Sequence, residues 1–560
     1  MATTPSKQRW LLRRITFFRA NRLTTLTVLL SLFFPASLRA QTATGSIVGT
    51  VTDSGGNIIP NANISLVNTR TSEVRRTVTN SRGSYSLTLL PPASYSLTVD
   101  NQGFSPFRQE NIDLNVGDDL TINATLKVGQ VAQQVTVTSQ PSALQTESSS
   151  LGQVITNKTI VDLPVNGRNS YSFAALVPGV LPSAGFTQTA VDEYNDQFIS
   201  INGSRPNSNI FLLDGGTNTE PGFNGPGFYP SIDMVDQYKV QTNNYSAEFA
   251  NTTGGVINVI TKSGTNRFHG SLYEFFRSTG LNGNNFFANQ AGLSRAPFHY
   301  NQFGASAGGP IVHDKTFFFF SYEGLRWTQA VTTTGTLPTA AERSGDFSGG
   351  LPIYDPFSTV SNPAVPGQYV RTQFAGNTIP ASRIDPVAKN LLNYFPLPNL
   401  PGAVNNFISN ASSPIDKNDF SIRIDQSLPA NSKLFGRYSI STTDQDRPPV
   451  YGKDFAVGAP ILGSDTLRQM QATINDATVL SPSVVLELSS SYVRYHITRL
   501  PPGQGFDPTQ LGFPSYFSTL AQTTIPCFPT VTVGGLGTSE SIPNIGWGGL
   551  IGPAVLDRNT

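Results

Sequence analysis

Apolar and polar side chains alternate over much of this 560-residue chain, in two separate regions. In the first, residues 44–128, short alternating runs such as Ile64–Leu66 and Tyr95–Val99 are separated by turn sequences such as Asp53–Gly56. Glycine supplies the positive φ that a tight hairpin needs. Several short period-2 runs spaced by turns are typical of a β-sandwich, so we expect residues 44–128 to form one.

The second alternating region covers residues 265–560. Its clearest run places Phe420, Ile422 and Ile424 on one face, and on the other Asp419, Ser421, Arg423 and Asp425. Similar runs recur, joined by short turns at one end and by long Pro/Gly-rich stretches such as 328–418 at the other. This arrangement is typical of a transmembrane antiparallel β-barrel, which closes so that no backbone group stays unpaired in lipid. A soluble adhesin made of several sandwiches is the alternative.

The first 40 residues read as an export signal. They carry seven basic residues and no acidic one, and their apolar run, 23–34, is too short for a spanning helix. Ala40 before Gln41 is the plausible cleavage point. A membrane anchor or a buried amphipathic helix are the alternatives. Without this segment the charge falls from +1 to −6, from 30 basic and 36 acidic residues, which gives no electrostatic reason to bind nucleic acid.

Composition excludes several classes of catalytic and metal site. Only 13% of residues are charged, and the chain has one Cys and four His, no two of which have metal-ligand spacing. Its glycine pairs form no phosphate-binding loop, and no G-x-S-x-G sequence is present. We therefore expect no metal, no cofactor, no catalytic residues and no enzyme activity.

Residues 129–150 form a polar linker that contains one segment of high β-propensity, namely Val135, Thr136, Val137, Thr138 and Ser139. Such a segment can add as an edge strand to the sheet of a partner. The alternative is that it forms the last strand of the sandwich.

Residues 151–262 combine short apolar strands with one or two short helices, which predicts a small α/β domain. It holds the most specific motifs of the chain: LPVNGRN with Asn166, Gly167 and Arg168; NGSRPNSNIFLLDG with Asn202, Gly203, Arg205, Asp214 and Gly215; and GGVINVITKSGTN with Gly254 and Gly255.

These motifs resemble the plug domain and first barrel strand of a TonB-dependent outer-membrane transporter. The order sandwich, plug and barrel is similar to the Oar-like type of that family, and residues 49–99 resemble the carboxypeptidase regulatory domain, a carbohydrate-binding-like fold. The expected fold is therefore mainly β: a signal peptide (1–40), the sandwich (44–128), a linker (129–150), an α/β plug (151–262) and the N-terminal part of a barrel (263–560).

The resemblance also implies partners. The segment Val135–Ser139 lies where the family places its TonB box, which pairs as a strand with a periplasmic energy coupler. The plug motif residues have either a structural or a gating role. The resemblance thus implies an outer-membrane receptor in contact with lipid, a TonB-type coupler and an extracellular ligand. The sandwich favours a carbohydrate or peptide as that ligand, unless it is only a spacer.

About seven or eight strands can be counted after Lys262, whereas transporters of this class need about 22. The sequence therefore predicts a truncated chain that holds the front half of a longer protein. A non-transporting adhesive or structural outer-membrane protein is the alternative function.

Overall fold

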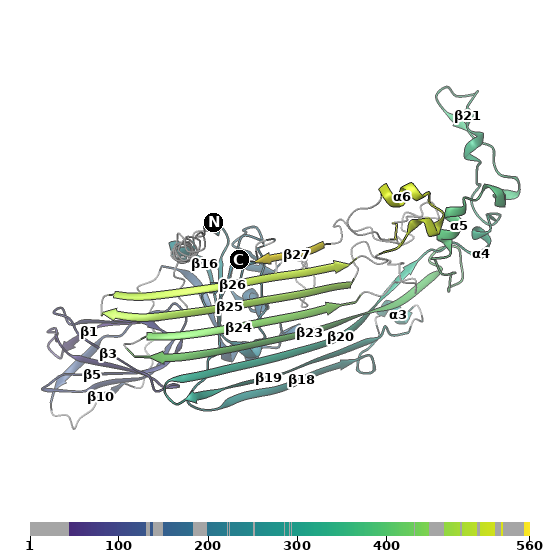
Figure 1. The fold of residues 1–560 in the computed structure, drawn as a ribbon. Helices are drawn as coiled ribbons and strands as arrows, with labels where there is room; N and C mark the ends of the chain where they lie inside the picture. Colours follow the sequence, from purple (N-terminus) through teal and green to yellow (C-terminus); the bar gives the residue numbers. More distant parts are fainter. Residues whose placement is uncertain are drawn as a thin grey trace, which may run out of the picture.

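The computed structural model describes residues 44–129, 135–137, 149–182, 199–220, 222, 224–249, 252–284, 286–290, 292, 294–429, 432–446, 464–481, 484–500, 505–520, 528–529 and 554–559. The expected signal peptide lies outside these residues. A sandwich stands at one end of a sheet of long strands, and a third region packs behind that sheet (Figure 1). No helix within the described ranges is long and apolar enough to cross a membrane.

The N-terminal region is the expected β-sandwich. One sheet has the order β4-β1-β9-β6, with β8 also paired to β1, and the other has the order β10-β7-β5-β2-β3. The strands are β1 (Gly45–Asp53), β2 (Asn63–Asn68), β3 (Val74–Val78), β4 (Ser84–Leu90), β5 (Ala93–Asp100), β6 (Phe104–Ser105), β7 (Phe107–Leu114), β8 (Asp119–Thr121), β9 (Ala124–Val128) and β10 (Val135–Val137).

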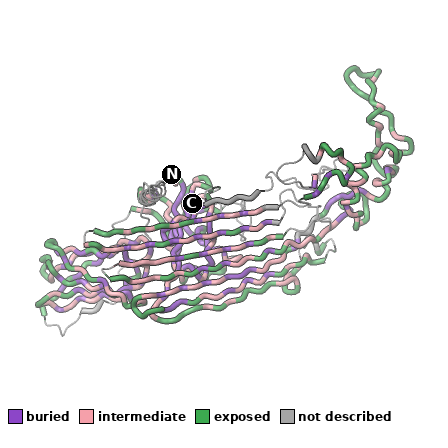
Figure 2. The backbone as a smooth tube through the Cα atoms, viewed as in Figure 1, coloured by how far each residue is buried: buried purple, intermediate pink, exposed green. Residues whose placement is uncertain are grey.

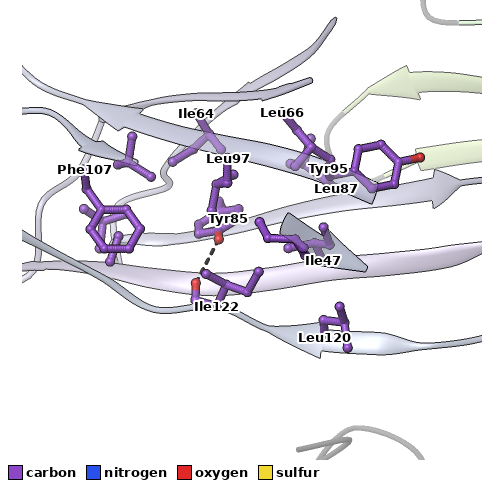
Figure 3. Packing of buried hydrophobic residues seen from close by; sticks show 14 of the residues in the cluster. Ile47, Ile64, Leu66, Tyr85, Leu87, Tyr95, Leu97, Phe107, Leu120 and Ile122 are labelled. Carbon is purple, nitrogen blue, oxygen red and sulfur yellow. Dashed lines mark hydrogen bonds between the residues drawn. The ribbon is translucent and has the colours of Figure 1, made fainter. Parts of the chain in front are cut away.

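Alternation buries one face of each sandwich sheet. Ile47, Leu66 and Leu97 are fully buried between the two sheets, where apolar side chains pack together (Figure 3). The buried Tyr85 hydroxyl donates a hydrogen bond of 2.8 Å to the Ile122 carbonyl, so its polar end is not left without a partner.

The middle domain, residues 151–262, is built on a five-stranded sheet of order β11-β16-β17-β14-β15. Its elements are β11 (Leu151–Thr156), α2 (Asn157–Asp162), η1 (Asn166–Arg168), η2 (Ser170–Leu176), β12 (Val180–Pro182), β13 (Ile199–Ile201), β14 (Ile210–Leu213), β15 (Gly216–Thr217), η3 (Ile232–Met234), β16 (Val235–Asn243), η4 (Ala247–Phe249) and β17 (Val256–Thr261). Every residue of the central strand β17 is buried, because the sheet is covered on both faces.

The barrel sheet is one eight-stranded antiparallel sheet in chain order. It consists of β18 (His269–Ser278), β19 (Phe298–Val312), β20 (Thr316–Gly335), β23 (Phe407–Leu428), β24 (Ser432–Gln445), β25 (Ser464–Ser481), β26 (Val484–Leu500) and β27 (Ala554–Asn559). Its first and last strands do not pair with each other, so among the described strands the sheet stays open.

The sequence predicts a tight turn around Gly309-Pro310, between strands at 299–308 and 315–325, and this prediction is wrong. Strand β19 runs through Gly309-Pro310, and the chain turns at 313–315 instead. A shift of register between Pro310 and Val312 explains this, because a bulge tolerates a residue that cannot donate to the ladder.

Burial in the barrel sheet is the reverse of burial in the sandwich. In the middle of β23, Asp419 and Ser421 are buried, whereas Phe420, Ile422 and Ile424 are exposed. The middle domain behind the sheet is largely buried, while the long strands alternate between buried and exposed positions (Figure 2). The polar face of the barrel sheet is thus covered by protein and the apolar face is open.

Short turns join the strands at the sandwich end, and long loops join them at the other end (Figure 1). The largest described loop, 336–406, is shorter than the expected 328–418, because β20 and β23 extend further than the alternation indicates. It contains α4 (Ala340–Arg343), β21 (Val360–Ser361), β22 (Tyr369–Val370) and α5 (Pro386–Leu392). Short helices α3 (Phe286–Gln290) and α6 (Ser515–Leu520) lie in other loops.

Candidate functional site: the contact between the middle domain and the barrel sheet

A buried carboxylate joins the middle domain to the barrel sheet. Asp214 follows strand β14 in the left-handed conformation, at φ +53°, and is 2% exposed. Its Oδ1 accepts hydrogen bonds from the Thr261 backbone N–H at 2.8 Å and from Arg423 Nη1 at 3.0 Å. Its Oδ2 accepts from Thr261 Oγ1 at 2.8 Å and from Arg437 Nε at 2.6 Å.

Two arginines of the barrel sheet supply the positive charge at this contact. Arg437 on β24 is fully buried, and it also donates to Ser439 Oγ at 2.9 Å. Arg423 on β23 pairs with Asp425 as well, and its guanidinium lies 4.4 Å from the Phe435 ring centroid. Burial alone would raise the pKa of Asp214, but the two arginines and the Thr261 hydrogen bonds hold it below its usual value.

A second charge cluster forms around Arg168, in the predicted Asn-Gly-Arg motif. Arg168 Nε donates to Glu323 Oε2 of β20 at 3.1 Å, and its Nη2 pairs with Asp233 of the middle domain. Its guanidinium lies 4.3 Å from the Tyr273 ring centroid, and the Tyr273 hydroxyl donates to Glu323 at 2.7 Å. Arg168 therefore bridges its own domain and the barrel sheet.

The predicted glycines have a role in folding. A Cβ atom on Gly254 would lie 2.4 Å from Asn209 Oδ1, and one on Gly255 would lie 2.4 Å from Ile201 Cδ1. Gly215 has φ +75°, and its N–H donates to Asn258 Oδ1 at 3.3 Å. A side chain at these positions would disturb the central sheet.

The remaining predicted residues shape turns. Gly167 and Gly203 have φ of +72° and +77°, and Asn202 has φ +52°. The Asn202 side chain donates to the Thr242 carbonyl at 2.9 Å, which ties its turn to β16. Arg205 is exposed, and Asn166 begins the short η1 helix. Among the predicted residues whose side chains the structure describes, Arg168 and Asp214 form ion pairs with the barrel sheet.

Sequence reasoning missed the partners of those two residues: Asp233, Tyr273, Glu323, Arg423 and Arg437. A signal was present, because Arg423 had been placed on the polar face of an alternating strand. In the run 419–425, Arg423 is the one cation on a face that also carries Asp419 and Asp425, and an arginine on the inner face of a barrel strand is a candidate for a buried ion pair.

Backbone of the middle domain also touches the barrel sheet directly. A Cβ atom on Gly216 would lie 2.8 Å from Thr473 Oγ1 and 2.9 Å from Ser491 Cβ, and one on Gly227 would lie 2.4 Å from Val493 Cγ1. The Thr217 N–H donates to Ser491 Oγ at 3.1 Å, so this part of the contact depends on close approach and not on charge.

The sandwich is tied to both other regions. Glu73 pairs with Lys433 of β24 and, at 2.9 Å, with Arg75 of its own domain. Lys239 of β16 donates to the carbonyls of Val116 at 2.9 Å and Gly117 at 3.0 Å. A cavity of about 120 Å³ lies where the three regions meet, and both Glu73 and Arg423 line it.

The predicted TonB-box segment lies partly within the described residues. Val135–Val137 form β10, which pairs in parallel with β7 of the sandwich, while Thr138 and Ser139 fall outside the described part of the chain. In this structure the segment is therefore an edge strand of the sandwich. No group of three or more His, Cys, Asp or Glu residues within the described part could hold a metal ion.

Comparisons with known proteins agree with this architecture. Residues 260–548, more than half of the chain, match the family described as Outer membrane beta barrel domain, and residues 46–127 match the Carboxypeptidase regulatory-like domain. The chain is 29% identical over 321 residues to the TonB-dependent transporter Oar of Myxococcus xanthus. This alignment covers 54% of this chain and 29% of that protein.

Two similar solved structures are siderophore receptors named PirA. The receptor from Pseudomonas aeruginosa is 13% identical, with 62% of this chain and 50% of that chain covered and a TM-score of 0.29. The receptor from Acinetobacter baumannii is 16% identical, with 68% and 52% covered and a TM-score of 0.31. The chain thus spans about half the length of these receptors and less than a third of Oar.

The family matches and the Oar alignment confirm the resemblance to TonB-dependent outer-membrane receptors of the Oar-like type, and the mainly β fold class is confirmed as well. The exposed apolar face of the barrel sheet has the physical character of a surface that meets lipid. The chain therefore belongs to the outer membrane beta barrel domain family, and it resides in the outer membrane.

Proposed function

We propose that the chain takes part in energy-coupled uptake of an extracellular ligand through the outer membrane. In this proposal the middle domain is the plug, and Val135–Ser139 is the segment that a TonB-type energy coupler binds. The observation that carries it is the position of the middle domain, which covers the polar face of the barrel sheet and is held there by buried charged side chains.

A charged contact suits a part that must move. The attraction between Asp214 and its two arginines is offset by the cost of removing all three charges from water. When the two surfaces separate and water enters, every charged group recovers its hydration. The net free-energy cost of separating the middle domain from the barrel sheet is therefore smaller than the many short ion-pair distances suggest. Removal of a single partner, by contrast, leaves an unpaired charge buried in the contact.

The curated relative is a transporter, which supports a transport role for this chain over an enzymatic one. The ligand is unidentified. The carboxypeptidase regulatory-like match at 46–127 favours a carbohydrate or a peptide.

Deletion of residues 133–140 tests the coupling role. We expect cells carrying the deletion in the natural full-length protein to bind fluorescent peptide or oligosaccharide probes at the surface but to lose uptake that depends on the proton-motive force. Deletion of residues 141–148, of equal length in the same linker, is the matched control. Uptake that survives removal of residues 133–140 would overturn the coupling assignment.

A non-transporting adhesive protein is the second candidate. The loop 336–406 favours it, because the loop exposes Phe357 and Tyr369. Its strand β21 lies far from the middle domain, where the loop could contact another surface (Figure 1). Adhesion needs no energy, so uptake that is unchanged by a protonophore, or absent altogether beside strong surface binding, would select this candidate.

A further inference from the structure

The coupling segment is already part of a sheet before any coupler binds. Strand β10 pairs in parallel with β7, with Val135 opposite Phe107, Thr136 opposite Arg108 and Val137 opposite Gln109. Among the described strands β10 ends its sheet, so one edge is held by β7 and the other edge is open.

An open edge presents unpaired N–H and C=O groups to an incoming strand. A segment that is already extended loses less conformational freedom on binding than a free one does. We propose that the sandwich is the docking platform for the coupler: it holds Val135–Val137 so that a strand of the coupler adds to the open edge and extends the sheet. This proposal rests on the proposed function, because it needs Val135–Ser139 to be the coupler-binding segment.

The platform is connected to the middle domain at the end of the same strand. Strand β7 ends at Leu114, and the turn that follows contains Val116 and Gly117, whose carbonyls both accept from the Lys239 ammonium group. The Val116 N–H donates to Gln237 Oε1 at 2.9 Å, and Gln237 Nε2 donates to Asn115 Oδ1 at 3.1 Å. Lys239 and Gln237 both lie on β16 of the middle domain.

Burial makes this connection firm. Lys239 is 9% exposed, so water cannot readily replace the hydrogen bonds that its ammonium group donates to the two carbonyls of the turn. The 115–117 turn therefore gives load on β10 a path to the middle domain through β7, beside the covalent path along the chain to β11. The platform accounts for why a sandwich precedes the middle domain in the chain and why it is tied to it.

A disulfide across the β10–β7 pair tests the platform. Thr136→Cys and Arg108→Cys, in the natural full-length protein with Cys527→Ser, place two thiols at directly paired positions, whose Cα separation in a sheet suits a disulfide. The probe is the purified periplasmic domain of a TonB-type coupler. We expect the oxidised protein to bind this domain as tightly as the reduced protein, or up to about tenfold more tightly, because the strand is held in its bound form.

The opposite result overturns the platform. If the coupler has to strip β10 from β7, oxidation will weaken binding by at least about tenfold and a reductant will restore it. If the disulfide does not form, as seen by mass spectrometry, hydrogen exchange of the unaltered protein decides whether the two strands pair. Thr136→Cys alone controls for the loss of the threonine.

Hydrogen exchange supplies a second measurement on the unaltered protein. We expect the amides of Val135–Val137 to exchange more slowly than in a free peptide without the coupler, and more slowly still with it. If these amides exchange at free-peptide rates in the absence of the coupler, the platform is overturned but the coupling role is not. The coupling role itself fails only if both the reduced protein and the unaltered protein bind no coupler.

Discussion

The sandwich and the barrel sheet share one sequence pattern and bury opposite faces. In the sandwich, Ile64 and Leu66 of β2 are buried, and the polar Ser65 between them lies on the outer face. In the barrel sheet, Phe420 and Ile422 are exposed, and Ser421 between them is 4% exposed. Both regions consist of β-strands with a side-chain period of two, although the sandwich contains parallel as well as antiparallel pairs.

The difference shows that a period-2 pattern reports two faces but not which of them is inside. In water the apolar face has to be covered, at about 25 cal/mol for each Å² removed from solvent. In lipid that driving force is absent, so the polar face is the one that needs a partner. The surrounding solvent therefore decides which face the middle domain covers.

We expect the largest effect from removing the negative charge at the centre of the polar face of the barrel sheet, which the middle domain covers. Asp214→Ala leaves Arg423 and Arg437 buried with one acceptor fewer, and we expect a loss of about 3–5 kcal/mol in the free energy of unfolding. The shift in the urea midpoint of protein reconstituted in lipid vesicles measures it.

Asp162→Ala is the control for that substitution. Asp162 pairs with Lys158 in the same domain, but both side chains are well exposed, and exposed pairs contribute about 0–1 kcal/mol. Equal shifts for the two variants would mean that the Asp214 contact is not buried in the native protein.

We expect an intermediate effect from placing a charge on the apolar face of the barrel sheet, and this substitution tests whether that face meets lipid while the sandwich meets water. Ile422→Arg places a charge on the exposed face of the barrel sheet, which costs about 2–4 kcal/mol if that face meets the middle of the bilayer. Val78→Arg, at a 52% exposed position of the sandwich, should shift stability by no more than about 0.5 kcal/mol. Urea unfolding in vesicles compares them, and two equally small values would contradict lipid contact at Ile422.

The smallest effect concerns the tie between the sandwich and the barrel sheet. Glu73→Gln weakens the bonds to Lys433 and Arg75, and we expect a loss of about 1–2 kcal/mol, seen as faster proteolytic release of the sandwich. Glu110→Gln is the control, because Glu110 pairs with the half-exposed Arg108 of its own domain.

The same tie has a defined pH dependence. Burial opposes ionisation of Glu73, but Lys433 and Arg75 hold its pKa below the usual value. Its contribution is therefore complete above the unfolded pKa of about 4.3 and is lost as the pH falls through the lower folded value. Release rates should match between pH 8 and 5 and rise below about pH 4; a rise near pH 6 would point to a different group.

Much of the architecture could be predicted from local pattern. Turn chemistry and alternation located the sandwich, the polar and apolar faces of β23, and about the right number of barrel strands, because each depends on residues close in sequence. The course of β19 could not be predicted, since the Gly309-Pro310 pair looks like a turn and only the pairing with β20 shows that the strand continues.

The contacts between regions were harder to predict. Asp214 and Arg437 are 223 residues apart, and no local rule connects a carboxylate after a short strand with an arginine on a distant one. The glycine motifs were easier, because a positive φ or a close approach follows from local geometry. The sequence therefore indicated which residues of the middle domain matter, but not what they touch.

The close approach at Gly216 and Gly227 has a consequence for how this protein can diverge. The two members of an ion pair can be substituted one after the other, or can exchange their charges, and the pair still remains neutral. The identities of both residues can therefore change together across relatives. At these glycines any side chain would collide with Thr473, Ser491 or Val493. We expect the uncharged part of the contact to record the ancestry of the fold more faithfully than the ion pairs do, and to be the harder part to redesign.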